Sequence, residues 1–136
     1  MQQNKYLDKL RIPIEKYGVN FTAQNDKRKE KWKKQRKKYG FDERETWSLD
    51  QTFVEWIYSH LMMYLEIGGK IINLEYHKFE FKDREYTQRE AIEYICKACE
   101  NFLLDKSFDY EKERQITEDM KDAIRLFAEI FPAMWW

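Results

Sequence analysis

The sequence predicts a small α+β domain, mainly α, with about four helices and one β-hairpin. Three observations support this prediction. Apolar residues recur at helical spacing over three segments, two of these segments follow a Ser/Thr-x-x-Glu/Gln capping pattern, and a short alternating segment lies between them. The 136 residues are 43% hydrophobic and 17% aromatic. This is enough apolar material for one core, so we predict a single domain over 1–136.

The first 25 residues are predicted to be the least regular part of the chain. Tyr6 and Leu7 favour a short helical turn, and Ile12 is expected to be extended because it precedes a proline. The sequence then predicts a basic helix over 27–39, with Asn25 or Asp26 as its N-cap and Gly40 ending it.

The core is predicted to lie in residues 48–136. Ser48 and Gln51 form a candidate capping box for a helix over about 49–66, which Gly68 and Gly69 end. The apolar stripe of this helix is wider than one face, and its members include Leu49, Phe53, Trp56, Ile57, Leu61, Met63, Tyr64 and Leu65. This width predicts a helix covered on more than one side, either as a central helix or at the interface of a homo-oligomer.

The segment after Gly69 is predicted to contain a hairpin. Ile71–Tyr76 is apolar and too short to distinguish helix from strand, whereas His77–Thr87 alternates in the manner of two short strands joined by a charged turn. Thr87 and Glu90 form a second capping box for a helix over about 88–104. Its expected inner face is Ile92, Ile95, Cys96, Cys99, Phe102 and Leu103.

The remaining chain is predicted to be a loop over 105–115 and a helix over about 118–131. Thr117 is the expected N-cap, and Pro132 ends the helix. The expected inner face is Met120, Ile124, Phe127, Ala128 and Phe131. The apolar tail 133–136, with two tryptophans, is expected to fold back onto the body or to lie in a subunit contact.

The charges are balanced overall but unevenly distributed. Lys+Arg and Asp+Glu are 25 each, yet residues 27–38 hold nine basic residues and one acidic residue, a local charge of +8. The rest of the chain therefore has a charge of −8. Such a basic element either attracts a polyanion or lies against acidic groups of its own chain or of a second subunit.

One side of the basic helix combines arginine with aromatic rings. Arg28, Trp32 and Arg36 are spaced four residues apart, and Tyr39 falls on the same side. Guanidinium groups bind phosphate and flat rings stack on bases, so this pattern indicates a site for a nucleotide or a nucleic acid. The candidate ligand-binding residues are Arg28, Trp32, Lys33, Arg36, Lys37, Tyr39, Arg44 and Trp47. A solvated or internally paired charge run and a protein-binding surface are the competing interpretations.

The other chemistry-bearing residues do not indicate catalysis. Cys96 and Cys99 lie in mid-helix on the apolar face, where free thiols pack as small hydrophobic groups. Together with His60 and His77 they match no zinc-finger spacing. No nucleotide-binding, hydrolase or metalloprotease motif is present in the sequence. We therefore predict a non-enzymatic protein without a cofactor or a metal.

Several segments resemble a group of small uncharacterised proteins encoded in bacteriophage and prophage genomes. The resemblance lies in KKYGFDERETWSLD at Lys37–Asp50, in YHKF at Tyr76–Phe79 and in the ending PAMWW, and it spans about 30–136. It implies an accessory role in the bacterial cytoplasm during infection, such as binding a defence nuclease or capturing a signalling nucleotide. It implies no catalytic residue.

Together these expectations describe a cytoplasmic counter-defence protein that captures an anionic ligand, such as a signalling nucleotide. The first alternative is a nucleic-acid-binding regulator that uses the basic helix 27–39. The second is a protein inhibitor of a host defence enzyme. No apolar run is long enough to span a membrane and the first residues lack an apolar signal core, so we expect no membrane partner.

Overall fold

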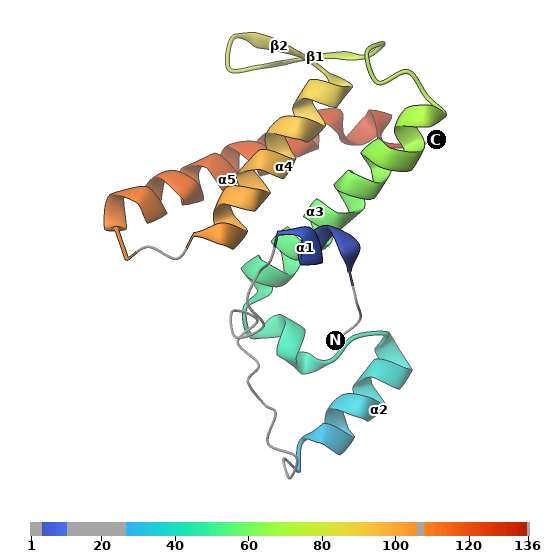
Figure 1. The fold of residues 1–136 in the computed structure, drawn as a ribbon, viewed down its shortest axis with the longest axis vertical. Helices are drawn as coiled ribbons and strands as arrows, with labels where there is room; N and C mark the ends of the chain where they lie inside the picture. Colours follow the sequence, from blue (N-terminus) through green and yellow to red (C-terminus); the bar gives the residue numbers. More distant parts are fainter. Residues whose placement is uncertain (1–3, 11–26, 106–107, 136) are drawn as a thin grey trace.

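The computed structural model describes residues 4–10, 27–105 and 108–135, and its mainly helical α+β architecture agrees with the predicted class (Figure 1). The α-helices of this part are α1 (Lys5–Lys9), α2 (Lys29–Tyr39), α3 (Leu49–Ile67), α4 (Gln88–Leu104) and α5 (Tyr110–Ile130). The 3₁₀ turns are η2 (Glu43–Thr46), η3 (Gly68–Lys70) and η4 (Phe131–Ala133), and the strands are β1 (Lys78–Phe81) and β2 (Arg84–Thr87).

Helix α4 is the centre of the core. It packs against α3 on one side and α5 on the other, and α3 and α5 are connected mainly through it (Figure 1). The predicted inner face is confirmed, because Ile92, Cys99 and Leu103 are fully or almost fully buried. The capping box that starts α4 is also confirmed, since Thr87 accepts from the Glu90 amide and Glu90 accepts from the Thr87 amide.

The predicted hairpin is confirmed and covers one end of α4 and α5. Strands β1 and β2 pair antiparallel, with Phe79 opposite Tyr86. The two turn residues, Lys82 and Asp83, both have positive φ (50° and 61°), which is the conformation of the tight turns that suit right-twisted strands. Lys82 also pairs with Asp122 of α5 at 2.6 Å, which fastens the turn to the helices.

The prediction for the last helix was wrong at its start and in its phase. Asp109 caps α5 by accepting from the amides of Glu111 and Lys112, so the helix begins at Tyr110 rather than after a loop, and Thr117 lies inside it. The buried face is Ile116, Met120, Ala123, Leu126 and Ile130. Ile124, Ala128 and Phe131 are exposed. Both sets have helical spacing, but the buried face is rotated about the helix axis toward Ala123, Leu126 and Ile130.

Smaller departures concern helix ends and the tail. Ser48 precedes α3 but makes no side-chain capping bond, so that predicted capping box is wrong. The segment Ile71–Tyr76 is neither helix nor strand. Trp135 is 76% exposed, so it does not fold back onto the body, whereas Met134 packs against the core. Asn25, Asp26, Ile12 and Trp136 lie outside the described residues.

Candidate functional site

The basic helix α2 lies at one end of the molecule and packs mainly against the short turn that follows it (Figure 1). It begins at Lys29, and Gly40 ends it in the left-handed conformation with φ of 85°. Glycine adopts this conformation without the steric cost that other residues have. The chain then reverses into η2, which brings the acidic residues of 42–45 against the arginine side of α2.

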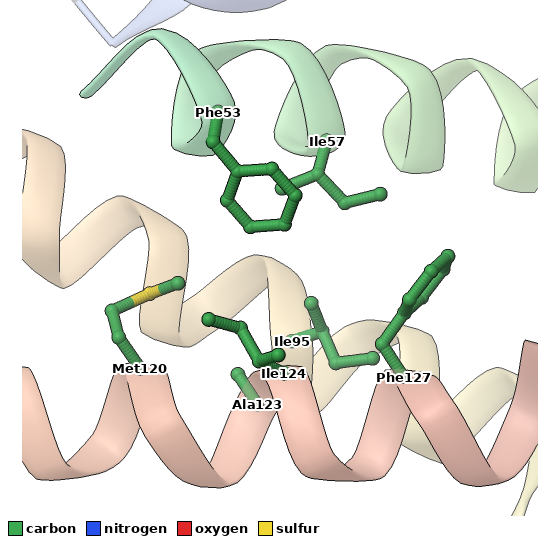
Figure 2. Close-up of a pocket in the computed structure, with 7 residues that line it drawn as sticks. All are labelled: Phe53, Ile57, Ile95, Met120, Ala123, Ile124 and Phe127. Carbon is green, nitrogen blue, oxygen red and sulfur yellow. The ribbon is translucent and has the colours of Figure 1, made fainter. Parts of the chain in front are cut away.

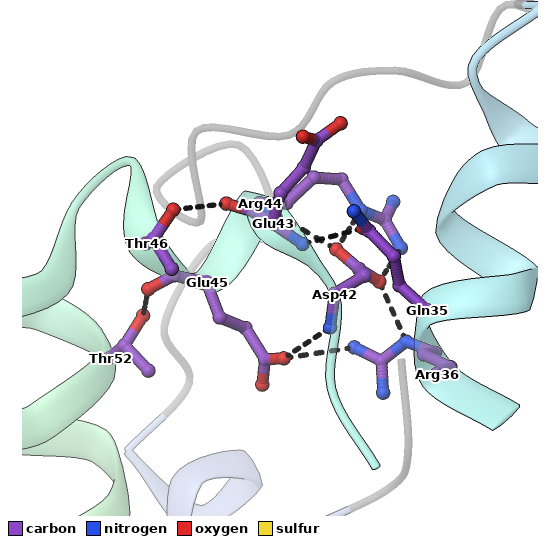
Figure 3. A network of polar contacts seen from close by, with 8 residues as sticks. All are labelled: Gln35, Arg36, Asp42, Glu43, Arg44, Glu45, Thr46 and Thr52. Carbon is purple, nitrogen blue, oxygen red and sulfur yellow. Dashed lines mark hydrogen bonds and ion pairs between the residues drawn. The ribbon is translucent and has the colours of Figure 1, made fainter. Parts of the chain in front are cut away.

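Asp42 is the centre of this contact (Figure 3). Its side chain caps η2 by accepting from the Arg44 amide at 3.0 Å, and Glu45 completes a capping box by accepting from the Asp42 amide. The Asp42 carboxylate also accepts from Arg44 Nε and Arg36 Nε, each at 2.8 Å, while no part of its side chain is exposed. The hydrogen bond from the Arg44 guanidinium, more than any other contact, lowers the pKa of Asp42 to about 2.

Trp32 is buried rather than available to a ligand. It is 2% exposed, and its indole nitrogen donates to Glu43 Oε1 at 2.9 Å. The guanidinium groups of Arg44 and Arg28 lie over the Trp32 ring, 4.5 and 5.1 Å from its centroid. The bond from Trp32 is also the main reason that the pKa of Glu43 falls below its ordinary value. The arginine–indole side is therefore an intramolecular contact.

The structure brings five of the eight candidate ligand-binding residues together around η2. Arg44 lies in η2 and Trp47 follows it, and their side chains contact those of Arg28, Trp32 and Arg36 or share Asp42 with them. Trp47 meets the edge of Trp32 at 6.1 Å between ring centroids. Tyr39 lies apart, exposed and beside Phe41 at 6.2 Å. Lys33 and Lys37 are also exposed.

The sequence reasoning did not identify the acidic half of this cluster. Asp42, Glu43 and Glu45 are not among the predicted site residues, although Asp42-x-x-Glu45 has the spacing of a capping box. That pattern, directly after the glycine that ends a basic helix, is the signal that predicts a turn folded back onto the helix. Gln35 adds to the contact by accepting from the Glu43 amide at 3.0 Å.

A group of six lysines in and just before α2 is exposed. Within the described residues none of its lysines forms an ion pair, although Lys38 lies over the ring of Tyr39. We call this set the α2 lysine face, and it consists of Lys27, Lys29, Lys33, Lys34, Lys37 and Lys38. Lys31 is excluded because it pairs with Glu43 at 3.2 Å.

The remaining candidate residues do not form a reactive site in the part of the chain described here. Cys96 and Cys99 are buried free thiols, and burial raises the pKa of Cys99 to about 12 and that of Cys96 further still. His60 stacks on Trp56 at the surface, and no His, Cys, Asp or Glu cluster of metal-binding size occurs among these residues.

Comparisons with protein-family models, curated proteins and solved structures give no match to this chain. The residues themselves are therefore the basis for a functional argument. Among the described residues, no helix has both the length and the apolar character needed to cross a membrane.

Proposed function

We propose that this chain is a non-enzymatic binding protein that holds the phosphate backbone of a nucleic acid on the α2 lysine face. One observation supports this function above the others. Arg36 and Arg44 are held by Asp42, whereas the lysines of the α2 lysine face are exposed and form no ion pair within the described residues. Internal ion pairs with Asp42, Glu43 and Glu45 account for Arg36 and Lys31 but not for the six lysines of the α2 lysine face.

The dimensions of α2 suit a polyanion. Its eleven residues extend about 16 Å, a length over which one strand of a DNA duplex places about five phosphates. Lysine ammonium groups on long side chains reach phosphates without a fixed geometry. The like charges at i and i+4, Lys33 with Lys37 and Lys34 with Lys38, cost the free helix a few tenths of a kcal/mol per pair, and bound phosphates would remove that repulsion.

Capture of a small signalling nucleotide receives less support from the geometry. Such a ligand would need the guanidinium groups of Arg36 and Arg44, which donate to the buried Asp42 carboxylate. Displacing Asp42 would break charge-assisted hydrogen bonds and leave a carboxylate close to the phosphate. Two hollows of the described structure, one of about 330 Å³, are lined mainly by apolar side chains rather than by basic ones.

The same geometry predicts binding without strong sequence preference. The exposed side of α2 presents ammonium groups, which contact phosphates, and lacks the Asn, Gln or Arg side chains that read base edges. If the resemblance to phage proteins gives the correct context, the nucleic acid would belong to the phage or to its bacterial host.

The first prediction concerns four lysines of the α2 lysine face. Changing Lys33, Lys34, Lys37 and Lys38 together to glutamine keeps a good helix former at each position and removes four charges. We expect affinity for a duplex of about 25 base pairs to fall about 100-fold at low salt. The slope of log K against log salt should also become shallower by about 3. Fluorescence anisotropy over a salt series measures both quantities.

The matched control removes the same charge elsewhere. Changing four lysines outside α2 to glutamine should alter the affinity by less than about threefold. These control lysines are Lys9, Lys70, Lys78 and Lys97. Equal losses in the two variants would show a net-charge effect, and no binding by the unchanged protein to duplex or single strand would refute the proposal. Competition by polyglutamate but not by DNA would instead indicate an acidic protein partner.

A further inference from the structure

A second surface, on α3, is independent of the lysine face. Six side chains along α3 follow one another at spacings of four, three, four, three and four residues, and all six are exposed. We call them the α3 seam: Leu49, Phe53, Trp56, His60, Met63 and Ile67. The five apolar members are between 37% and 62% exposed. None of the six is Asp, Glu, Lys or Arg.

This spacing is the repeat by which helices pair. Residues three and four apart form one stripe on a helix, and an apolar stripe that alternates in this way fits between the side chains of a second helix. The opposite side of α3 already faces α4 through Ile57, Leu61 and their neighbours. The seam is therefore additional to the stripe that builds the core, which explains why the apolar pattern of α3 is wider than one face.

A small apolar hollow lies beside the seam. Figure 2 shows Phe53 and Ile57 of α3 pointing toward Ile124 and Phe127 of α5, with Ile95 of α4 behind them. The hollow lies between α3 and α5, which both pack on α4 (Figure 1). A second helix laid along the seam would cover this hollow.

We propose that a second copy of this chain occupies this position, with α3 of the two protomers pairing antiparallel along the α3 seam. The spacing of the seam is the same when read from either end. In an antiparallel pair Leu49 therefore lies opposite Ile67 of the second copy, Phe53 opposite Met63, and Trp56 opposite His60. The larger aromatic rings then meet smaller side chains, whereas a parallel pair would place Trp56 on Trp56. Antiparallel helices also align their dipoles favourably.

A hollow at one end of the seam could accept a side chain of the second copy in this register. A hollow of about 330 Å³ lies at the start of α3, lined in part by Phe41, Leu49 and Trp56. The register places Ile67 of the second copy over this hollow. Glu66, the one acidic residue beside that end of the seam, is held by Lys5 at 3.0 Å and by the Tyr6 hydroxyl, so it does not face the partner as an unpaired charge.

The exposed apolar area is sufficient for a stable dimer. Large side chains at about half exposure present roughly 100 Å² each, so the apolar seam residues together with Ile124 and Phe131 amount to about 700 Å² per protomer. Pairing two copies would bury about 1,400 Å², which lies within the range of specific protein interfaces. An isologous contact of this kind uses the same surface on both subunits.

Sedimentation equilibrium of the full chain tests the pairing. At concentrations up to about 100 µM, above the micromolar Kd that an interface of this size can give, the mass should be twice the 17.0 kDa of one chain. Leu49→Glu and, separately, Met63→Glu should each restore the single-chain mass, because they place a carboxylate opposite the apolar side chains of Ile67 and Phe53. Tyr76→Glu, at a 74% exposed residue outside the seam, should leave the dimer intact.

Each outcome decides the proposal. Circular dichroism checks that the seam variants keep the helical content, and two variants are used so that one misfolded protein does not decide the test. A single-chain mass for the unchanged protein at every concentration would overturn the proposal and leave a different protein as the occupant of the seam. A dimer that persists in both folded seam variants would overturn it as well, by placing the contact elsewhere.

Cysteine pairing tests the direction of the helices. Leu49→Cys and Ile67→Cys, each alone, should form no disulfide-linked dimer, whereas an oxidised equimolar mixture should form a linked pair. Linked dimers from either variant alone would show a parallel arrangement instead. The native Cys96 and Cys99 do not interfere, because both thiols are buried and have a raised pKa.

Discussion

Replacing Leu126 by alanine is expected to lower the free energy of unfolding by about 3 kcal/mol. Leu126 is fully buried in α5, where it belongs to the core formed with α3 and α4. Removing its side-chain carbons loses their burial and leaves a cavity that the two neighbouring helices cannot fill without moving. Urea unfolding followed by circular dichroism measures the change in midpoint at constant slope.

The matched control is Ile124→Ala, two residues away on the same helix. Ile124 is 47% exposed, so its truncation should cost less than about 1 kcal/mol. The comparison tests the phase of α5, because the sequence prediction placed Ile124 inside and did not name Leu126. A larger loss for Ile124 than for Leu126 would contradict the observed orientation of the helix.

Replacing Asp42 by asparagine is expected to loosen α2 from η2. The substitution keeps the shape but removes the charge that the guanidinium groups of Arg36 and Arg44 share. These two side chains are 42% and 27% exposed, so water screens part of the loss, and we expect about 2 kcal/mol rather than the full cost of a deeply buried pair. Hydrogen exchange of the α2 amides measures this local change.

An exposed carboxylate outside the contact between α2 and η2 serves as the control. Asp50, in the first turn of α3, is exposed, and Asp50→Asn should change the exchange of α2 amides by less than about 0.5 kcal/mol. Unchanged α2 protection in the Asp42 variant would show that α2 is held by packing of Trp32 rather than by the ion pairs.

The low pKa of Asp42 also predicts how the contact responds to acid. In the unfolded chain this carboxyl binds a proton near pH 4, whereas in the folded chain it does so only near pH 2. The stabilisation is therefore complete above about pH 4 and is lost as the pH falls toward 2, by about 2 kcal/mol in total. Exchange protection of α2 should fall over this range in the unchanged protein and show less pH dependence in Asp42→Asn.

The elements that the sequence predicted most accurately are those with strong local signals. Helix α4 has a capping box at Thr87 and an amphipathic face, and its apolar pattern stops after Leu104. Its predicted and observed limits coincide. The hairpin followed from alternation alone, even though Lys82 and Asp83 are less usual in such a turn. Local preference and tertiary packing agree in these segments.

The candidate site was predicted only in part, because its acidic half comes from η2, which folds back onto α2 after Gly40. Helical spacing placed Arg28, Trp32 and Arg36 on one side of α2, and the structure confirms that arrangement. Spacing does not show what covers that side. The turn after Gly40 brings Asp42 and Glu43 onto it, so the residues expected to meet a ligand instead meet their own chain.

The sequence by itself determined the helical class, the hairpin, the extent of α3 and α4 and the concentration of positive charge in one element, because each depends on residues close together along the chain. Only the tertiary structure decided which side of each helix is covered. In the tertiary structure η2 covers the arginine side of α2, and Leu126 rather than Ile124 is buried. The α3 seam stays exposed. The physical reason is that burial of a side chain depends on which other elements pack against it, and neither composition nor period specifies those partners.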